Sequence, residues 1–126
     1  MTALAQAQTG YGSNARTIRT PRDIEYDVLA RITGQLQKAI ADTGPTGFPN
    51  LAAALQENSR LWSVFAMDLA DSGNQFPQDL RARMFYLAEF TLQHTFKVLN
   101  GTAKADALVD INLAVMRGLR GQRVGA

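Results

Sequence analysis

The chain has 126 residues, of which 46% are hydrophobic and 19% charged, and its net charge at neutral pH is +2. This length and balance are typical of one globular domain that buries roughly two-thirds of its unfolded surface. So small a net charge does not by itself indicate nucleic acid, and the absence of cysteine excludes disulfides and thiol chemistry. No apolar run approaches the ~20 residues of a membrane helix, and the first residues do not resemble a signal peptide. We therefore expect a cytoplasmic protein without a membrane span.

The chain begins with small and polar residues, and we expect residues 1–19 to form a flexible arm. Thr20 and Pro21 are typical of a helix start, because threonine can cap free amides and proline suits the first turn. Apolar residues at helical spacing then predict a helix over 21–41. Glycines and prolines between residues 42 and 49 predict a break after it.

The next helix, predicted over 50–71, is the centre of the bundle. Its apolar residues recur at alternating steps of four and three, which places them on one helical face. Asn50 can cap its start. Trp62, the only tryptophan, lies on the apolar face and should be buried. Asn58 on this helix and Asn112 further along interrupt apolar faces, so we expect each to hydrogen-bond to another element.

Two more helices are predicted over 77–100 and 105–119. The apolar side of the third helix is formed by Leu80, Met84, Leu87, Ala88, Leu92, Val98 and Leu99, with Phe85 and Phe96 at its margin. Asn100 and Gly101 suit a helix end, and Gly118 and Gly121 should release the chain into a basic tail, residues 120–126. Short breaks between helices favour antiparallel neighbours. The fold class is therefore all-α, a single-domain antiparallel bundle of about four helices in up-down-up-down order, with the helical domain spanning 20–119.

The residues that usually carry chemistry are missing. His94 is the only histidine, and no acidic residue stands near it in the sequence to orient it. No spacing of His, Asp or Glu suggests metal ligands, and no glycine motif suggests a phosphate-binding loop. We therefore expect no enzyme activity, no cofactor and no metal site.

A binding surface has more support. Tyr86 and Phe90 are one turn apart on the third helix, on a face that also carries Arg83 and Lys97. Two aromatic residues on a polar face either pack under the arm or loops, or contact a partner. These four residues are the candidate partner-binding site, whereas Asn58, Trp62 and Asn112 are candidates for a polar and aromatic core.

Several motifs together resemble one family, the FlaF flagellar biosynthesis regulators. The resemblance runs from Tyr11 to Leu119 and depends on the order and spacing of the following residues: Pro21-Arg22 with Glu25, Asn58 with Leu61-Trp62 and Asp68, Pro77 with Leu80-Arg81, His94-Thr95, and Asp110-Ile111-Asn112 with Gly118-Leu119. It implies a small cytoplasmic protein that controls the production and export of flagellin. It also implies that the chain binds flagellin as a secretion chaperone does and acts alongside the mRNA regulator FlbT. It implies no catalytic residues.

Two mechanisms stay open at this point. A helical bundle with an apolar groove can hold an amphipathic helix of flagellin. Alternatively, the chain regulates flagellin mRNA by binding RNA, which requires a basic patch with stacking aromatic residues. Arginines near both ends of the chain give modest support to the second: Arg16, Arg19, Arg22, Arg117, Arg120 and Arg123. The flagellin segment bound, the level of control and the oligomeric state are not indicated by the sequence.

Overall fold

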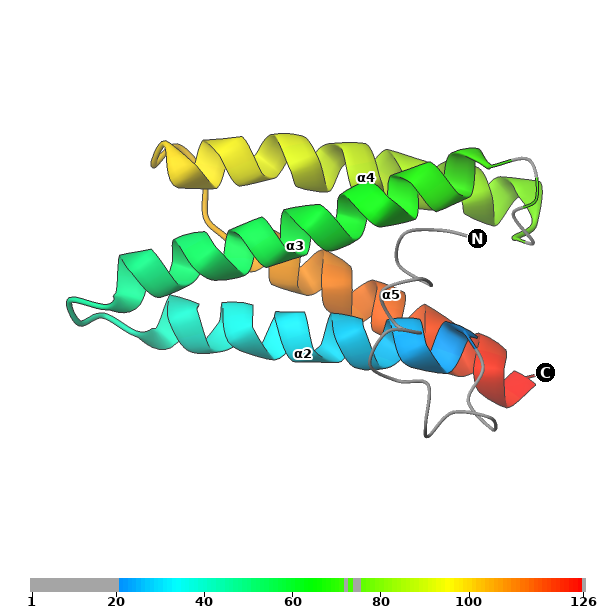
Figure 1. Ribbon diagram of the computed structural model, residues 1–126, viewed down its shortest axis with the longest axis horizontal. Helices are drawn as coiled ribbons and strands as arrows, with labels where there is room; N and C mark the ends of the chain where they lie inside the picture. Colours follow the sequence, from blue (N-terminus) through cyan, green and yellow to red (C-terminus); the bar gives the residue numbers. More distant parts are fainter. Residues whose placement is uncertain (1–20, 72, 74–75, 126) are drawn as a thin grey trace.

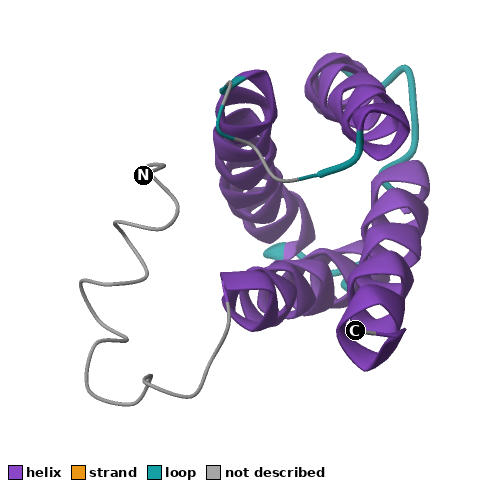
Figure 2. Ribbon diagram, turned by 90° about the vertical axis from the view of Figure 1, so that its right-hand side faces the viewer, coloured by secondary structure: helices purple, strands orange, loops and turns teal. Residues whose placement is uncertain are grey.

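The part of the chain that the structure describes folds as an up-down-up-down bundle of four helices (Figure 1). The computed structural model describes residues 21–71, 73 and 76–125, with side chains between residues 26 and 121. The helices are α2 (Pro21–Ala41), α3 (Gly47–Ala70), α4 (Gln78–Leu99) and α5 (Asp106–Gly125). Seen along the bundle, they surround a common interior (Figure 2). This confirms the predicted all-α antiparallel bundle. The predicted arm, residues 1–19, and Thr20, the predicted cap of the first helix, lie outside the described residues.

Both ends of α3, α4 and α5 differ from those predicted, most of them by one residue. α3 begins at Gly47, so Asn50 is not its cap, and the Asn50 amide donates to the carbonyl of Thr46 at 3.0 Å. Pro77 precedes α4 as its N-cap residue rather than opening the helix, and α4 ends at Leu99. α5 continues to Gly125, so the predicted end at 119 is wrong. Its glycines lower helix propensity by about 1 kcal/mol each but do not stop a helix whose backbone stays right-handed.

The turn between α2 and α3 is built on Asp42. One carboxylate oxygen accepts the amide of Gly44 at 2.8 Å, and the other accepts the hydroxyl of Thr46 at 2.8 Å. The hydrogen bond from Gly44, followed by that from Thr46, holds the pKa of Asp42 below its usual range. A Cβ added at Gly47 would collide with the backbone carbonyl of Asp42. Only glycine therefore allows this close return of the chain into α3.

Asn100 and Gly101 follow the last residue of α4, as predicted for a helix end. Gly101 has φ of +83°, the left-handed conformation that glycine adopts without strain. Its amide donates to the carbonyl of Val98 at 3.1 Å, and the amide of Thr102 donates to that of Lys97 at 2.8 Å. This pair of bonds is the Schellman motif. It ends α4 sharply and turns the chain toward α5.

The core consists of two apolar clusters with a layer of polar side chains between them. One cluster surrounds Trp62, and the other contains Leu36, Leu55 and Leu108. In every helix, the buried polar residues fall in the sequence between the members of the two clusters. These residues, called the polar layer below, are Thr33 on α2, Asn58 on α3, Thr91 and Thr95 on α4, and Asn112 on α5. The bundle therefore has polar contacts at the middle of its length.

Candidate functional site

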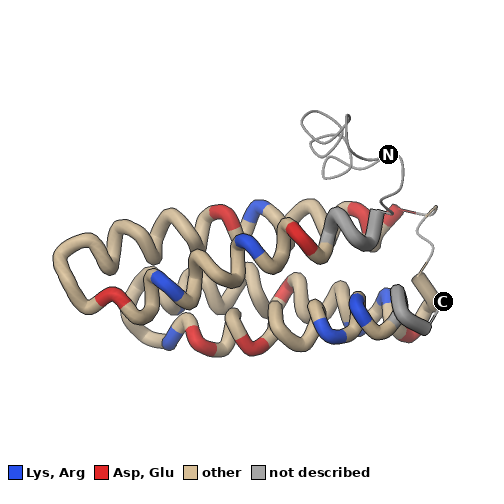
Figure 3. Tube along the Cα trace, turned by 90° about the horizontal axis from the view of Figure 1, so that it is seen from below, with Lys and Arg blue, Asp and Glu red and all other residues tan. Residues whose placement is uncertain are grey.

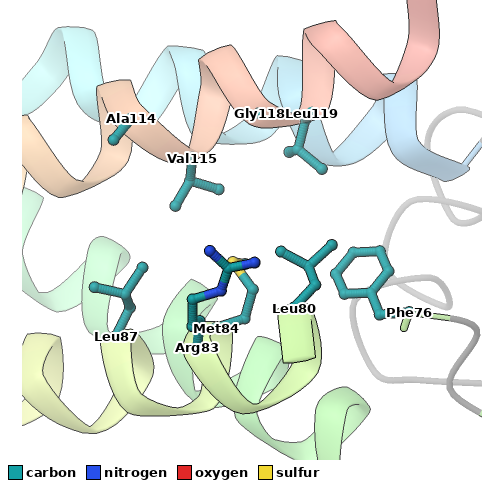
Figure 4. Close-up of a pocket in the computed structure, with 9 residues that line it drawn as sticks. All are labelled: Phe76, Leu80, Arg83, Met84, Leu87, Ala114, Val115, Gly118 and Leu119. Atoms are coloured by element: carbon teal, nitrogen blue, oxygen red, sulfur yellow. The ribbon is translucent and has the colours of Figure 1, made fainter. Parts of the chain in front are cut away.

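An apolar groove lies between α4 and α5. These two helices make few direct contacts, whereas α2 packs closely on α3 and α5, and α3 packs closely on α4. The groove has a volume of about 230 Å³. Figure 4 shows side chains from the two helices facing each other across it. The lining residues are Phe76, Leu80, Arg83, Met84 and Leu87 on the α4 side, and Ala114, Val115, Gly118 and Leu119 on α5.

The two walls of this α4–α5 groove differ in size. Leu80 and Leu87 extend from α4, whereas α5 contributes the small residues Ala114 and Gly118 beside Val115 and Leu119. A Cβ added at Gly118 would meet no described atom within 4 Å, so no close packing demands a glycine at this position. A glycine inside a helix is less favourable than alanine by roughly 0.5–1 kcal/mol. Gly118 keeps the α5 wall low, which lets another helix approach the backbone of α5.

Arg83 is the one charged side chain that lines the groove. It is exposed and has no hydrogen bond or ion pair within the described residues. The neighbouring Arg81, in contrast, is engaged within the fold, since its Nε donates to the carbonyl of Leu69 at 2.6 Å. That bond joins the start of α4 to the end of α3, where the helix dipole favours positive charge. Arg83 can therefore pair with a carboxylate of a bound molecule.

The four residues predicted to bind a partner share one exposed stripe of α4. Arg83, Tyr86, Phe90 and Lys97 are separated by three, four and seven residues, and such positions lie on one side of a helix. Tyr86 is 67% exposed and Phe90 is 38% exposed, whereas Arg83 points into the groove (Figure 4). The structure therefore confirms that both aromatic residues are exposed and places them next to the groove. Their contact with a partner stays a prediction.

The groove itself was not predicted from the sequence. Leu80 and Leu87 were expected on the apolar side of α4, and in the structure they face a gap between α4 and α5. A signal exists in the sequence: Leu80 and Leu87 are seven residues apart on one side of α4, and Phe90 lies at the edge of that side. What the sequence does not show is that α4 and α5 stay apart. The helices that α4 contacts are known only from the structure.

His94 has a structural role. Its Nε2 donates to the carbonyl oxygen of Lys104 at 2.8 Å, which ties α4 to the segment that leads into α5. The ring of Phe90 stacks on it, with centroids 5.2 Å apart and planes inclined by 18°. These two contacts fix the orientation of the imidazole ring of His94.

A buried hydrogen-bond chain connects α3 to α5. Trp62 Nε1 donates to Asn112 Oδ1 at 2.9 Å, and Asn112 Nδ2 donates to Asn58 Oδ1 at 2.8 Å. All three side chains are fully buried, and the two asparagine predictions and the burial of Trp62 are confirmed. Within the described residues, Asn58 Nδ2 and Thr91 Oγ1 are buried without a partner. Such groups are unfavourable by about 1–3 kcal/mol each, so the polar layer serves to fix the register of the helices more than to add stability.

Two kinds of feature are absent from the described residues: clusters of metal ligands and membrane-spanning helices. The described residues contain no group of three His, Cys, Asp or Glu that could hold a metal ion. None of the helices, as far as they are described, is both long and apolar enough to cross a membrane. At the C-terminal end of α3, partial burial and the neighbouring Asp71 raise the pKa of Asp68. This carboxyl lies outside the set of residues that line the groove.

Comparison with known proteins identifies the family. The family described as flagellar protein FlaF matches residues 7–119. The match includes both walls of the α4–α5 groove and the whole polar layer. No curated protein and no solved structure matches the chain at a significant level. Because the family match covers most of the sequence, the chain belongs to the FlaF family of flagellar proteins.

Proposed function

We propose that this protein binds flagellin in the cytoplasm and keeps it unassembled until export, as a secretion chaperone does. The observation that carries the proposal is the α4–α5 groove, an apolar surface on a bundle whose other neighbouring helices are closely packed. An amphipathic helix buries its apolar face in such a groove. The family membership makes flagellin the natural candidate for that helix.

The groove suits a helix with two different sides. The bound helix would pack large apolar side chains against Leu80 and Leu87 and approach α5 closely at Ala114 and Gly118. A carboxylate at the edge of its apolar face would pair with Arg83, since charge-assisted hydrogen bonds are stronger than neutral ones. No catalytic step is part of this function, and we propose that the protein is not an enzyme.

Tyr86 and Phe90 extend the surface beyond the groove. Exposed aromatic residues beside an apolar pocket are typical energetic centres of an interface. If both are such centres, truncation of each to alanine should weaken binding by roughly 2 kcal/mol, about thirtyfold in affinity. Neither belongs to the two core clusters, so the fold should persist.

The test is a titration of purified monomeric flagellin against matched variants. Gly118→Leu should fill the groove and weaken binding at least about tenfold, because a helix could no longer approach α5. Gly34→Leu is its control: Gly34 is also helical and exposed, and an added Cβ there meets no described atom within 4 Å. The double variant Tyr86→Ala/Phe90→Ala should bind far more weakly than wild type. Absence of binding by the wild-type protein would overturn the chaperone mechanism, and equal affinities of all variants would overturn the site.

Binding of flagellin mRNA, alone or together with FlbT, is the alternative. Arg117 and Arg120 are exposed on α5 and favour it. Against it, Lys and Arg are interspersed with Asp and Glu along the bundle (Figure 3). RNA binding should weaken steeply as salt is raised, whereas binding in an apolar groove should change little. Co-purification from lysate with and without RNase separates the two.

A further inference from the structure

A second apolar surface lies on the side of α4 that faces away from the groove. Most of the large hydrophobic residues that are exposed belong to it, and Phe96 and Met67 are 70% and 66% exposed. We call it the α3–α4 outer face and define it by Phe48 and Met67 on α3 and by Phe85, Phe96 and Leu99 on α4. Phe85 and Leu87 are two residues apart, which places them on nearly opposite sides of the helix. The outer face is therefore separate from the α4–α5 groove.

The alignment of α3 and α4 along the bundle determines which residues of this face lie at the same level. The bond from Arg81 to the carbonyl of Leu69 sets the antiparallel alignment of the two helices. Counting equal numbers of residues along each helix from this pair brings Met67 close to the level of Phe85. Between Phe48 and Met67, the same side of α3 carries short side chains at Ala52, Ser59 and Ser63, with Gln56 as the one longer side chain. Aromatic residues on α4 thus stand beside a low strip on α3.

The charges on the outer face make it complementary to a second copy of the same face. The same register places Arg60 on α3 and Glu89 on α4 at one level, both exposed. Neither has a hydrogen bond or an ion pair within the described residues. One side of the face thus carries a positive charge and the other side a negative charge. If a second copy faces this surface, related by a two-fold axis that runs between the copies and parallel to the helices, each of the two charges lies opposite the other kind.

We propose that the α3–α4 outer face binds a second copy of this chain in a two-fold dimer whose axis runs parallel to the helices. α3 of one copy then lies across α4 of the other, and Arg60 meets the partner subunit's Glu89 twice, once on each side of the axis. The aromatic side chains of α4 pack on the low strip of α3 in the other copy. A two-fold interface requires this kind of self-complementary surface.

The area is sufficient for a reversible dimer. The exposed parts of the five hydrophobic side chains amount to roughly 500 Å², since a large aromatic side chain alone covers ~150–250 Å². A stable interface takes about 800 Å² from each partner, and the surrounding polar residues supply the remainder. This sum is comparable with the ~300–600 Å² of the largest apolar patch on a typical monomer, which often has a function. Because the groove lies on the other side of α4, dimerisation leaves it open.

Sedimentation equilibrium of the full chain between roughly 1 and 500 µM tests the proposal. Wild type should change from monomer to dimer within this range. Phe96→Ser with Met67→Ser should weaken the dimer at least about thirtyfold, as expected for residues at the centre of an interface. Tyr86→Ser, an equally exposed aromatic on the same helix outside the outer face, should leave dimerisation unchanged. Circular dichroism confirms that each variant is folded.

A charge exchange supplies the decisive test. Arg60→Glu alone and Glu89→Arg alone each create two like-charge contacts and should weaken the dimer at least about fivefold. The double variant Arg60→Glu/Glu89→Arg restores opposite charges across the axis and should return to within about threefold of wild type. A wild type that stays monomeric at the highest concentration overturns the proposal and leaves this face for a different protein. A double variant as weak as the single ones, or an effect of Tyr86→Ser as large as that of the outer-face variant, overturns it as well.

Discussion

Asn112 provides the most direct test of the polar layer. Replacing it by alanine removes the acceptor of Trp62 Nε1 and the donor to Asn58 Oδ1. Both groups are then left in a fully buried site, and each unsatisfied buried group is unfavourable by about 1–3 kcal/mol. With the small cavity that remains, Asn112→Ala should destabilise the fold by roughly 3–5 kcal/mol, a large part of the 5–15 kcal/mol typical of a domain.

Urea unfolding of single and double variants measures this effect. Trp62→Phe and Asn112→Ala should be non-additive by about 1–2 kcal/mol, because the two side chains share one hydrogen bond. Thr33→Val is the control: Thr33 is buried in the same layer, but its hydroxyl bonds only to the carbonyl of Leu29 in its own helix, at 2.7 Å. It should change stability by less than about 1 kcal/mol. If Asn112→Ala were as mild as Thr33→Val, the connection between α3 and α5 would not order the bundle.

Three further predictions concern stability. Trp62→Ala should lower the free energy of unfolding by about 3–5 kcal/mol through lost burial, and an unchanged melting temperature would contradict the central position of α3. Gly118→Ala should raise stability by roughly 0.5–1 kcal/mol because the site is open, whereas Gly47→Ala should lower it because of the collision with Asp42. The pKa of Asp42 is lower in the folded state than in the unfolded state, so its contribution is present above the unfolded pKa and is lost as pH falls through the folded pKa. Asp42→Asn should therefore flatten the acid side of the stability profile, and an NMR titration should find the Asp42 pKa below that of an unstructured aspartate.

Helix positions followed from the sequence because apolar spacing reports which face of each helix is buried. The ends that differ depend on contacts between distant atoms. The start of α3 at Gly47 requires the close approach of the Asp42 carbonyl, which no local pattern reveals. Gly118 was taken as part of a helix end because glycine often marks one. Whether such a glycine ends a helix or leaves space beside it depends on the neighbouring helices.

The candidate site was predictable only in part. Exposure of Tyr86 and Phe90 followed from their position opposite the apolar stripe. Leu99, predicted on the apolar side of α4, is 42% exposed, whereas the adjacent Val98 is buried in the cluster that contains Leu108. The polar layer was foreseen at Asn58 and Asn112, where an amide interrupts an apolar face. Burial of the threonines in the same layer was not predicted, because a threonine hydroxyl can donate a hydrogen bond to a carbonyl of its own helix and needs no partner from another element. The hydroxyl of Thr95, for example, donates to the carbonyl of Thr91 at 2.7 Å.

The polar layer helps to maintain the groove, because it positions one of the two helices that form the walls of the groove. α5 is positioned by its packing on α2 and by the hydrogen bonds of Asn112 to α3, and α4 is positioned by its packing on α3 and by the bond of Arg81. Neither helix needs extensive contact with the other to keep its place, and His94 ties α4 to the segment that leads into α5. A groove maintained in this way exists before a ligand arrives. A helix that enters it gains apolar burial without first separating two packed helices, so binding avoids much of the reorganisation that usually weakens association.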